Sequence, residues 1–139
     1  MRTEKEKMLA GERYDASAPD IQAELEATHR WLARYNASLD MTPSERRKLL
    51  EERLASVGDG SVIRPPFYCD YGFNIRLGAG VFLNFNCVIL DVVEVTIGDR
   101  TQIGPGETRV GHGSSSVTGW EEFGRSHLAR TVPNLSQPS

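Results

Sequence analysis

Apolar residues at helical spacing mark the first part of the chain, from Glu4 to about Val57. Pro19 suits the first turn of a helix, because a backbone nitrogen there needs no hydrogen-bond partner within the helix. The positions that follow recur at offsets of four, seven and three residues, which places them on one helix face: Ile21, Leu25, Leu32 and Tyr35. We therefore expect an amphipathic helix that buries this stripe.

A second helix is predicted to begin just after Thr42. An N-cap residue, a proline at the first helical position and a capping-box glutamate follow one another in the required order: Thr42, Pro43 and Glu45. Apolar residues at helical spacing continue from there to Val57. The glycines beyond it, Gly58 and Gly60, are typical of residues that end a helix.

From Ser61 to Gly106 the helical spacing gives way to a shorter fixed period. Aliphatic residues stand six positions apart in two runs: Leu77, Leu83 and Ile89, then Ile97 and Ile103. An aliphatic residue at every sixth position is typical of a hexapeptide parallel β-helix, in which short strands stack and these side chains point inward. The interval between Ile89 and Ile97 is eight, so we expect a two-residue insertion in a loop there.

The six-residue period fails after Gly106. It requires apolar residues at the next two positions of the series, where Arg109 and Ser115 stand. Burying an unpaired arginine in an apolar column would cost on the order of several kcal/mol. We therefore predict an α+β fold in three parts: a helical cap at residues 4–60, a partial parallel β-helix at 61–106 and an irregular, disordered tail at 107–139.

Composition excludes several classes of function. The 16 Lys and Arg residues against 19 Asp and Glu residues give a net charge of −3, which argues against nucleic-acid and anionic-membrane partners. We find neither a secretory signal nor a long apolar run, so we expect a cytoplasmic protein. Cys69 and Cys87 have no metal-ligand spacing and are predicted to be free, buried thiols.

Four segments resemble a known family: residues 7–16, 63–72, 84–91 and 96–106. They are similar to the maltose and galactoside O-acetyltransferases of the hexapeptide-repeat class, which also includes nodulation acetyltransferases. The resemblance extends over roughly residues 4–106. It implies a left-handed, single-stranded β-helix that forms homotrimers with active sites between subunits. It also implies transfer of acetyl from acetyl-CoA, as co-substrate, to a sugar hydroxyl of the maltose, glucose or galactoside type, with no metal.

The same resemblance assigns roles to individual residues. Asp15, Asp70 and Asp91 resemble acidic contacts to the acceptor sugar, with Val92 as an alternative to Asp91. Asn84 resembles an asparagine that lines the cleft near acceptor and acetyl donor. The alternative for these polar residues is local turn capping or a coil corner. The catalytic base of the family is a histidine after the coil that ends here at Pro105, which makes His112 the candidate, with a solvated loop histidine as the alternative.

Two functions stay open on the sequence. One is an acetyl-CoA-dependent sugar O-acetyltransferase. The other is a non-catalytic, truncated remnant that lacks the catalytic histidine and the acetyl-CoA cleft and co-assembles with a full-length homologue. A hexapeptide-class metalloenzyme would need three clustered histidines, and the chain has only His29, His112 and His127, which are far apart.

Overall fold

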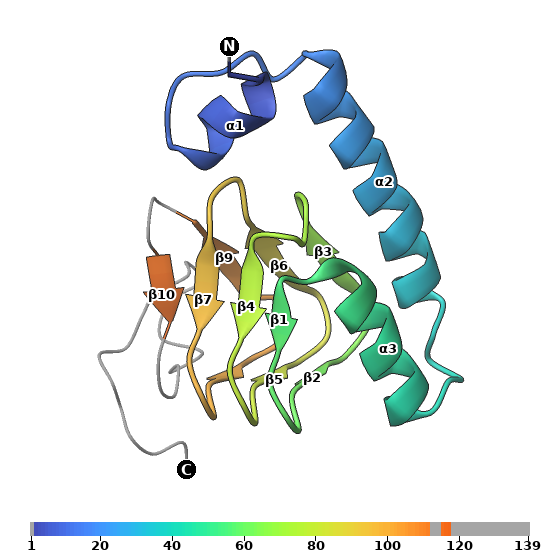
Figure 1. Ribbon diagram of the computed structural model, residues 1–139. Helices are drawn as coiled ribbons and strands as arrows, with labels where there is room; N and C mark the ends of the chain where they lie inside the picture. The colour runs from blue at the N-terminus through green and yellow to red at the C-terminus, as the bar shows by residue number, and fades with distance from the viewer. Residues whose placement is uncertain (1, 112–114, 118–139) are drawn as a thin grey trace.

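The computed structural model describes residues 2–111 and 115–117. Three helices precede a series of short strands (Figure 1). The helices are α1 (Glu4–Leu9), α2 (Pro19–Asn36) and α3 (Pro43–Arg53). The strands are β1 (Ser56–Val57), β2 (Val62–Ile63), β3 (Phe67–Cys69), β4 (Ile75–Leu77), β5 (Phe82–Leu83), β6 (Cys87–Leu90), β7 (Val95–Ile97), β8 (Gln102–Ile103), β9 (Thr108–Val110) and β10 (Ser115–Val117).

The predicted helix starts are confirmed. Pro19 opens α2, and α3 begins with the capping box in which the Thr42 hydroxyl accepts the Glu45 amide at 3.1 Å. The end of α3 differs from the prediction, because the helix stops at Arg53 and Val57 belongs to β1. Leu54 already has extended backbone, and the following amides bond the next coil: the Gly58 amide donates to the Leu77 carbonyl at 2.9 Å. Backbone pairing with the second coil therefore ends α3 at Arg53, before the chain reaches Gly58 and Gly60.

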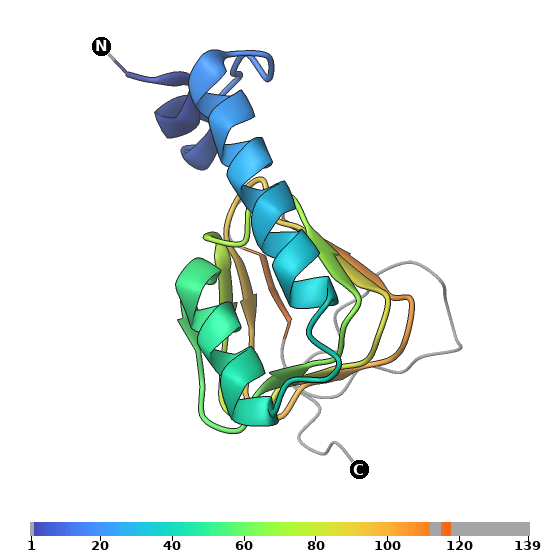
Figure 2. The ribbon, with the colours of Figure 1, turned by 90° about the vertical axis from the view of Figure 1, so that its right-hand side faces the viewer.

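The strands form three parallel sheets that make the faces of a triangular prism. One sheet has the order β1-β4-β7-β10, the second β2-β5-β8 and the third β3-β6-β9. Figure 2 looks along the prism from its first coil and shows the triangular outline. Each strand pairs with the strand one coil further on, which is the architecture of a single-stranded parallel β-helix, as the sequence predicted.

The turn with the two-residue insertion joins the third strand of one coil to the first strand of the next coil, and we call it the long corner. It recurs in every coil. Val57 pairs with Leu77, Leu77 with Ile97, and Ile97 with Val117, so equivalent residues are 20 positions apart. The predicted loop insertion after Ile89 is therefore one copy of a repeated feature. Ser115, the second position at which the six-residue spacing required an apolar residue, belongs to β10 and pairs with Val95 of β7.

Arg109 lies inside the β-helix. It belongs to β9, pairs with Ile89 of the preceding coil and is only 3% exposed. The prediction that the solenoid ends at Gly106 is therefore wrong, because strand pairing continues through β9 to Val110 and again in β10 to Val117. The guanidinium lies 3.6 Å from the Glu107 carboxylate and donates to the Thr108 carbonyl at 3.1 Å, so its charge is compensated. The other residues of the predicted tail, 112–114 and 118–139, lie outside the described residues.

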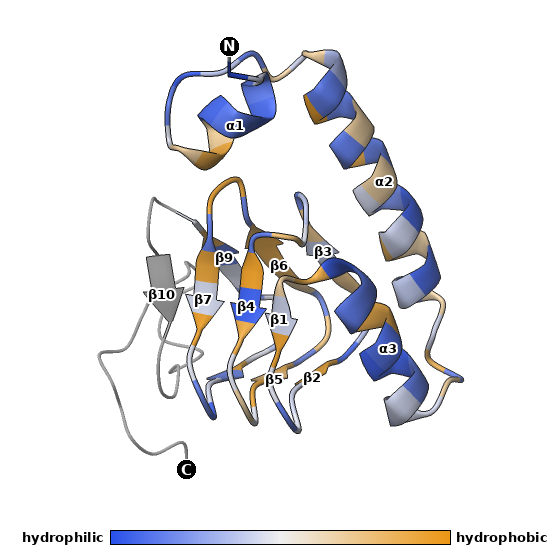
Figure 3. Cartoon of the chain, in the orientation of Figure 1, coloured by the Kyte–Doolittle hydropathy of each residue, from blue (hydrophilic) through white to orange (hydrophobic). Residues whose placement is uncertain are grey.

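The helical cap closes the first-coil end of the prism. Aromatic residues of α2 enter the same core as the inward columns of the coils: Trp31 stacks on Tyr35 at 5.4 Å between ring centroids and meets Phe67 edge-on. The Tyr35 hydroxyl donates to the Ile63 carbonyl at 2.5 Å, inside this core. Figure 3 shows apolar residues along the strands and polar residues on the outer faces of the helices. Cap and β-helix therefore share one core.

Candidate functional site

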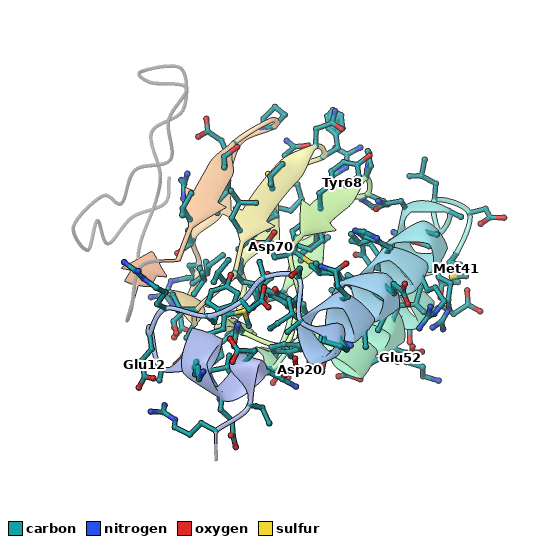
Figure 4. The ribbon with its side chains drawn as sticks, turned by 90° about the horizontal axis from the view of Figure 1, so that it is seen from above. Glu12, Asp20, Met41, Glu52, Tyr68 and Asp70 are labelled. Atoms are coloured by element: carbon teal, nitrogen blue, oxygen red, sulfur yellow. The ribbon has the colours of Figure 1, made fainter. Side chains whose placement is uncertain are left out.

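A loop of residues 70–74 joins β3 to β4 at the long corner of the first coil and carries Asp70. Seen from above in Figure 4, Asp70 lies at the end of β3, beside the segment that connects α1 and α2. Tyr14 of that segment packs against an apolar cluster that contains Tyr71 of the loop. The corner thus gathers residues of the cap and of two coils.

Asp91 holds this loop from the second coil. Its carboxylate is 0% exposed and accepts four backbone N–H groups, from Asp70 at 3.1 Å, Tyr71 at 2.9 Å, Gly72 at 2.7 Å and Asn74 at 3.2 Å. Burial raises the pKa of Asp91 to about 6, against the opposing effect of the N–H donors. Both oxygens are occupied by the protein, so this geometry differs from the acceptor contact that the resemblance implied for Asp91.

The cap holds the same loop from the other side. The Tyr71 carbonyl accepts the Arg53 Nε–H at 2.7 Å and the Thr28 hydroxyl at 3.1 Å. Gly72 has a φ of +88°, and a Cβ added there would lie 2.7 Å from Cγ of Arg53. The position therefore requires glycine both for its left-handed backbone and for the close approach of Arg53.

Phe73 is fixed between two cations of the cap. Lys5 Nζ lies 4.5 Å from the centre of its ring and the Arg53 guanidinium 5.3 Å from it. Both cations bond the carboxylate of Glu24, at 2.7 Å for Lys5 and 3.3 Å for Arg53. The loop is thus held through its backbone and through one aromatic side chain.

Asp70 is the acidic side chain that this arrangement leaves available. It is half-buried, and among the described residues the structure shows no hydrogen bond to its carboxylate. Burial raises the pKa of Asp70 above its ordinary value. A carboxylate without protein donors, on a loop fixed at both ends, is suited to accept hydrogen bonds from a ligand hydroxyl.

The other predicted site residues lie in different settings. Asp15 is exposed, and hydrogen bonds from the hydroxyl and amide of Ser17 lower its pKa. Asn84 stands at another corner, between β5 and β6, where its side-chain oxygen accepts the Phe85 amide at 2.9 Å. The structure therefore brings Asp70 and Asp91 together, and Asp15 follows Tyr14, which packs beside them. His112 lies outside the described residues.

Both cysteines are free thiols, as predicted. Cys87 is buried, and burial raises its pKa to about 11, whereas Cys69 is only partly buried against the core. In the described part of the chain, no three His, Cys, Asp or Glu side chains are grouped so that they could hold a metal ion. Over the same residues, no helix is both long and apolar enough to cross a bilayer.

Comparison with known proteins identifies the fold and the cap. Residues 7–58 match the family model described as the maltose acetyltransferase hexapeptide capping motif. A maltose O-acetyltransferase from Clostridium difficile 630 superposes with a TM-score of 0.70 at 30% identity, over 86% of this chain and 58% of that one. The chain belongs to the maltose and galactoside O-acetyltransferase family. The helices before β1 are thus the cap of this family, and the stacked coils are its hexapeptide-repeat β-helix.

Two further relatives are a nodulation protein and a hexapeptide-repeat acetyltransferase. Nodulation protein L of Rhizobium leguminosarum bv. viciae is 64% identical over 104 residues, which are 75% of this chain and 55% of that protein. A hexapeptide-repeat acetyltransferase from Vibrio cholerae, crystallised in complex with acetyl coenzyme A, has a TM-score of 0.69 at 38% identity, covering 77% of this chain and 57% of that one. The chain spans about half the length of the relatives that it matches.

Sequence reasoning missed the residues that hold the loop from the cap, Thr28 and Arg53. Thr28 stands on the same face of α2 as the predicted apolar stripe, which is the one sequence signal of its role, and in the structure it is fully buried. Arg53 has no such signal, because an arginine near the end of an amphipathic helix is usually solvated. Only the fold brings it to Tyr71, a residue 18 positions away.

Proposed function

We propose that this chain supplies the acceptor-binding side of an acetyl-CoA-dependent O-acetyltransferase that acts on a sugar hydroxyl. The observation that carries the proposal is the Asp70 carboxylate, which is half-buried and accepts no hydrogen bond from residues 2–111 or 115–117, while its loop is fixed by Asp91 and Arg53. Family membership supports the acetyl transfer, and the acetyl coenzyme A complex of the Vibrio cholerae relative supports the co-substrate.

Asp15 and Asp70 would bind the acceptor. Carboxylates accept hydrogen bonds from sugar hydroxyls, and a pair on two segments fixes the orientation of a ring as well as its position. Asp15 is exposed on the segment whose Tyr14 packs beside the loop of Asp70. Asn84, at its separate corner, would line the route of the acetyl donor. Asp91 would hold the loop that carries Asp70 through its backbone amides.

The transfer needs a general base, because a sugar hydroxyl is a weak nucleophile at neutral pH. A positioned base accelerates such a step by about 10²- to 10⁴-fold. His112 is the candidate base in this chain. A donor near the carbonyl oxygen of the acetyl group would stabilise the tetrahedral intermediate formed when the hydroxyl oxygen attacks and before the CoA thiolate leaves.

Assembly is part of the proposal. A homotrimer would place residues of neighbouring subunits around each site, and co-assembly with a full-length homologue would supply the coils that lie beyond the part shared with the relatives. The described coils have inward-facing apolar columns, such as Ile63, Leu83 and Ile103, that favour stacking of a further coil.

The test is acetyl transfer by the purified chain. Thiol release from acetyl-CoA is followed with maltose, glucose and a galactoside as acceptors, and the mass of each sugar is measured for the addition of one acetyl group. We expect transfer that falls at least tenfold in His112→Ala. Folded protein that transfers nothing alone but raises transfer by a full-length homologue above the rate of that homologue alone supports co-assembly. Absence of transfer by the chain alone, together with no such rise in the mixture, refutes the proposed function.

A further inference from the structure

We propose that Asp91 and Arg53 are positioning residues that hold the loop of residues 70–74 from opposite sides and so present Asp70 to the acceptor. This inference rests on the proposed function, because it gives the loop a task in acceptor binding. It assigns to Asp91 a different role from the direct acceptor contact that the sequence resemblance implied. Arg53 receives a role for which the sequence contained no indication.

The contacts of Asp91 fit a positioning role. Each oxygen accepts two backbone amides: Oδ1 bonds Asp70 and Tyr71, and Oδ2 bonds Gly72 and Asn74. The Asn74 side chain in turn donates to the Asp91 carbonyl at 2.8 Å. A carboxylate that is 0% exposed and bonded in this way cannot also reach a sugar hydroxyl. It can set the conformation of a loop at four points.

Arg53 supplies what a preceding coil would otherwise provide. The loop belongs to the first coil, so only the second coil stacks on it, and Asp91 comes from that side. On the other side the Tyr71 carbonyl meets Arg53 and Thr28 of the cap. The amide and the carbonyl of Tyr71 are therefore both bonded, one to each neighbour.

Asp91 and Arg53 both bond the backbone of Tyr71, the residue next to the candidate acceptor contact Asp70. Asp70 immediately precedes Tyr71, and its own amide is one of the four that Asp91 accepts. A shift of this backbone would move the Asp70 carboxylate, while the corner of Asn84, between β5 and β6, would stay in place. Loss of either anchor should therefore weaken acceptor binding more than acetyl-CoA binding.

Amide hydrogen exchange tests the clamp directly. In Asp91→Asn the side chain keeps its shape, but its NH₂ group cannot accept the amides that Oδ1 or Oδ2 accepts now. We expect exchange at Tyr71 and Gly72 to accelerate by about 10- to 100-fold, with unchanged exchange at Ile97 and Ile103. Glu52→Gln is the matched control, because it makes the same chemical change at an exposed ion pair with Arg34. Unchanged exchange at residues 70–74 would overturn the clamp.

Steady-state kinetics test the positioning role. We expect Asp91→Asn and Arg53→Lys each to raise the acceptor KM by about tenfold, with the acetyl-CoA KM within about twofold of wild type. We expect Arg53→Met to raise the acceptor KM more than Arg53→Lys does, because lysine keeps the cation beside Phe73 and one hydrogen-bond donor. Arg34→Lys, at an exposed pair, is the control. An equal effect on both KM values, or an effect on kcat alone, contradicts positioning.

The two proposals fail in different ways. A wild-type chain that transfers no acetyl group alone and does not raise transfer by a full-length homologue refutes the proposed function, while the exchange data still decide whether the clamp exists. If Asp91→Asn does not fold, Arg53→Lys carries both measurements, since it changes the loop from the cap side only. Transfer by wild type with unchanged acceptor KM in both variants refutes the positioning role and leaves the function intact.

Discussion

Oδ2 of Asp91 lies 2.7 Å from the backbone nitrogen of Gly72, although the two residues are 19 positions apart. This bond joins the long corners of two consecutive coils. It places a buried carboxylate under a loop that the cap covers from above, through Arg53 and the Tyr71 carbonyl. The candidate acceptor site therefore depends on one contact within the β-helix and one between the β-helix and its cap.

The pH dependence of stability should contain a contribution from Asp91. Its pKa is raised from 3.8 to about 6 by burial, so the folded chain holds this proton more tightly than the unfolded chain. The stabilisation is then complete below pH ~4 and is lost as the pH rises through ~6. We expect the free energy of unfolding of wild type, relative to Asp91→Asn, to fall by roughly 1–3 kcal/mol between pH 4 and 7.

Urea denaturation at several pH values measures this difference. Glu4, Asp15 and Glu24 have lowered pKa values and shift the stability of both proteins in the opposite direction, so only the comparison with Asp91→Asn isolates Asp91. A wild type that gains stability over Asp91→Asn as the pH rises would mean that the four N–H donors outweigh burial.

Gly72→Ala should destabilise the chain. The residue has a φ of +88°, and its new Cβ would lie 2.7 Å from Cγ of Arg53, so both the backbone and the Arg53 contact must change. We expect a loss of about 1–3 kcal/mol in the free energy of unfolding. Gly60→Ala is the matched control, since Gly60 also has a positive φ but its Cβ would meet nothing within 4 Å. Equal losses in the two variants would show that the Arg53 contact contributes nothing.

Tyr35→Phe should lose a buried hydrogen bond without a change in shape. The Tyr35 hydroxyl donates to the Ile63 carbonyl at 2.5 Å, and burial raises the pKa of Tyr35 to about 12. We expect a loss of about 1–2 kcal/mol in chemical denaturation, because the carbonyl is left without its donor. Tyr68→Phe, at a side chain that is 47% exposed, should change stability by less than about 0.5 kcal/mol. A neutral Tyr35→Phe would indicate that water reaches Ile63.

Thr42→Ala should weaken the start of α3. The Thr42 hydroxyl and the Glu45 carboxylate each bond the other residue's amide, and alanine removes the first of these bonds. The expected cost is about 0.5–2 kcal/mol, measured as a lower midpoint of thermal unfolding. Ser44→Ala, inside the first turn of the same helix, serves as the control and should be close to neutral. A larger effect at Ser44 would contradict the assigned N-cap.

Asp70→Asn should raise the acceptor KM. The variant keeps the size of the side chain but loses the charge that strengthens hydrogen bonds from sugar hydroxyls. We expect an increase of about tenfold with maltose, glucose or a galactoside, and little change in the acetyl-CoA KM. Asp59→Asn, in the exposed turn between β1 and β2, is the control. Identical kinetics in wild type and Asp70→Asn would remove Asp70 from the acceptor site.

Features that depend on neighbouring residues were predictable from the sequence. The capping box at Thr42, the proline start of α2 and the six-residue spacing of inward aliphatic residues are local patterns, and the structure confirms them. The family resemblance likewise rested on four local segments, residues 7–16, 63–72, 84–91 and 96–106. The end of α3 was not predictable in this way, because the backbone after Leu54 bonds the second coil, about twenty residues further on.

The amino-acid sequence by itself determined the order of the parts, a helical cap followed by a parallel β-helix, since helix capping and strand periodicity are short-range effects. Only the tertiary structure decided where Arg109 and Asp91 lie. A buried charge is tolerated when partners surround it. Arg109 has Glu107 and Thr108 beside it in its own coil. The Asp91 carboxylate accepts backbone amides of the preceding coil, and the loop of Asp70 is also held by the cap. For this reason the sequence indicated Asp70 and Asp91 as candidate site residues, while their different roles followed from contacts between coils and with the cap.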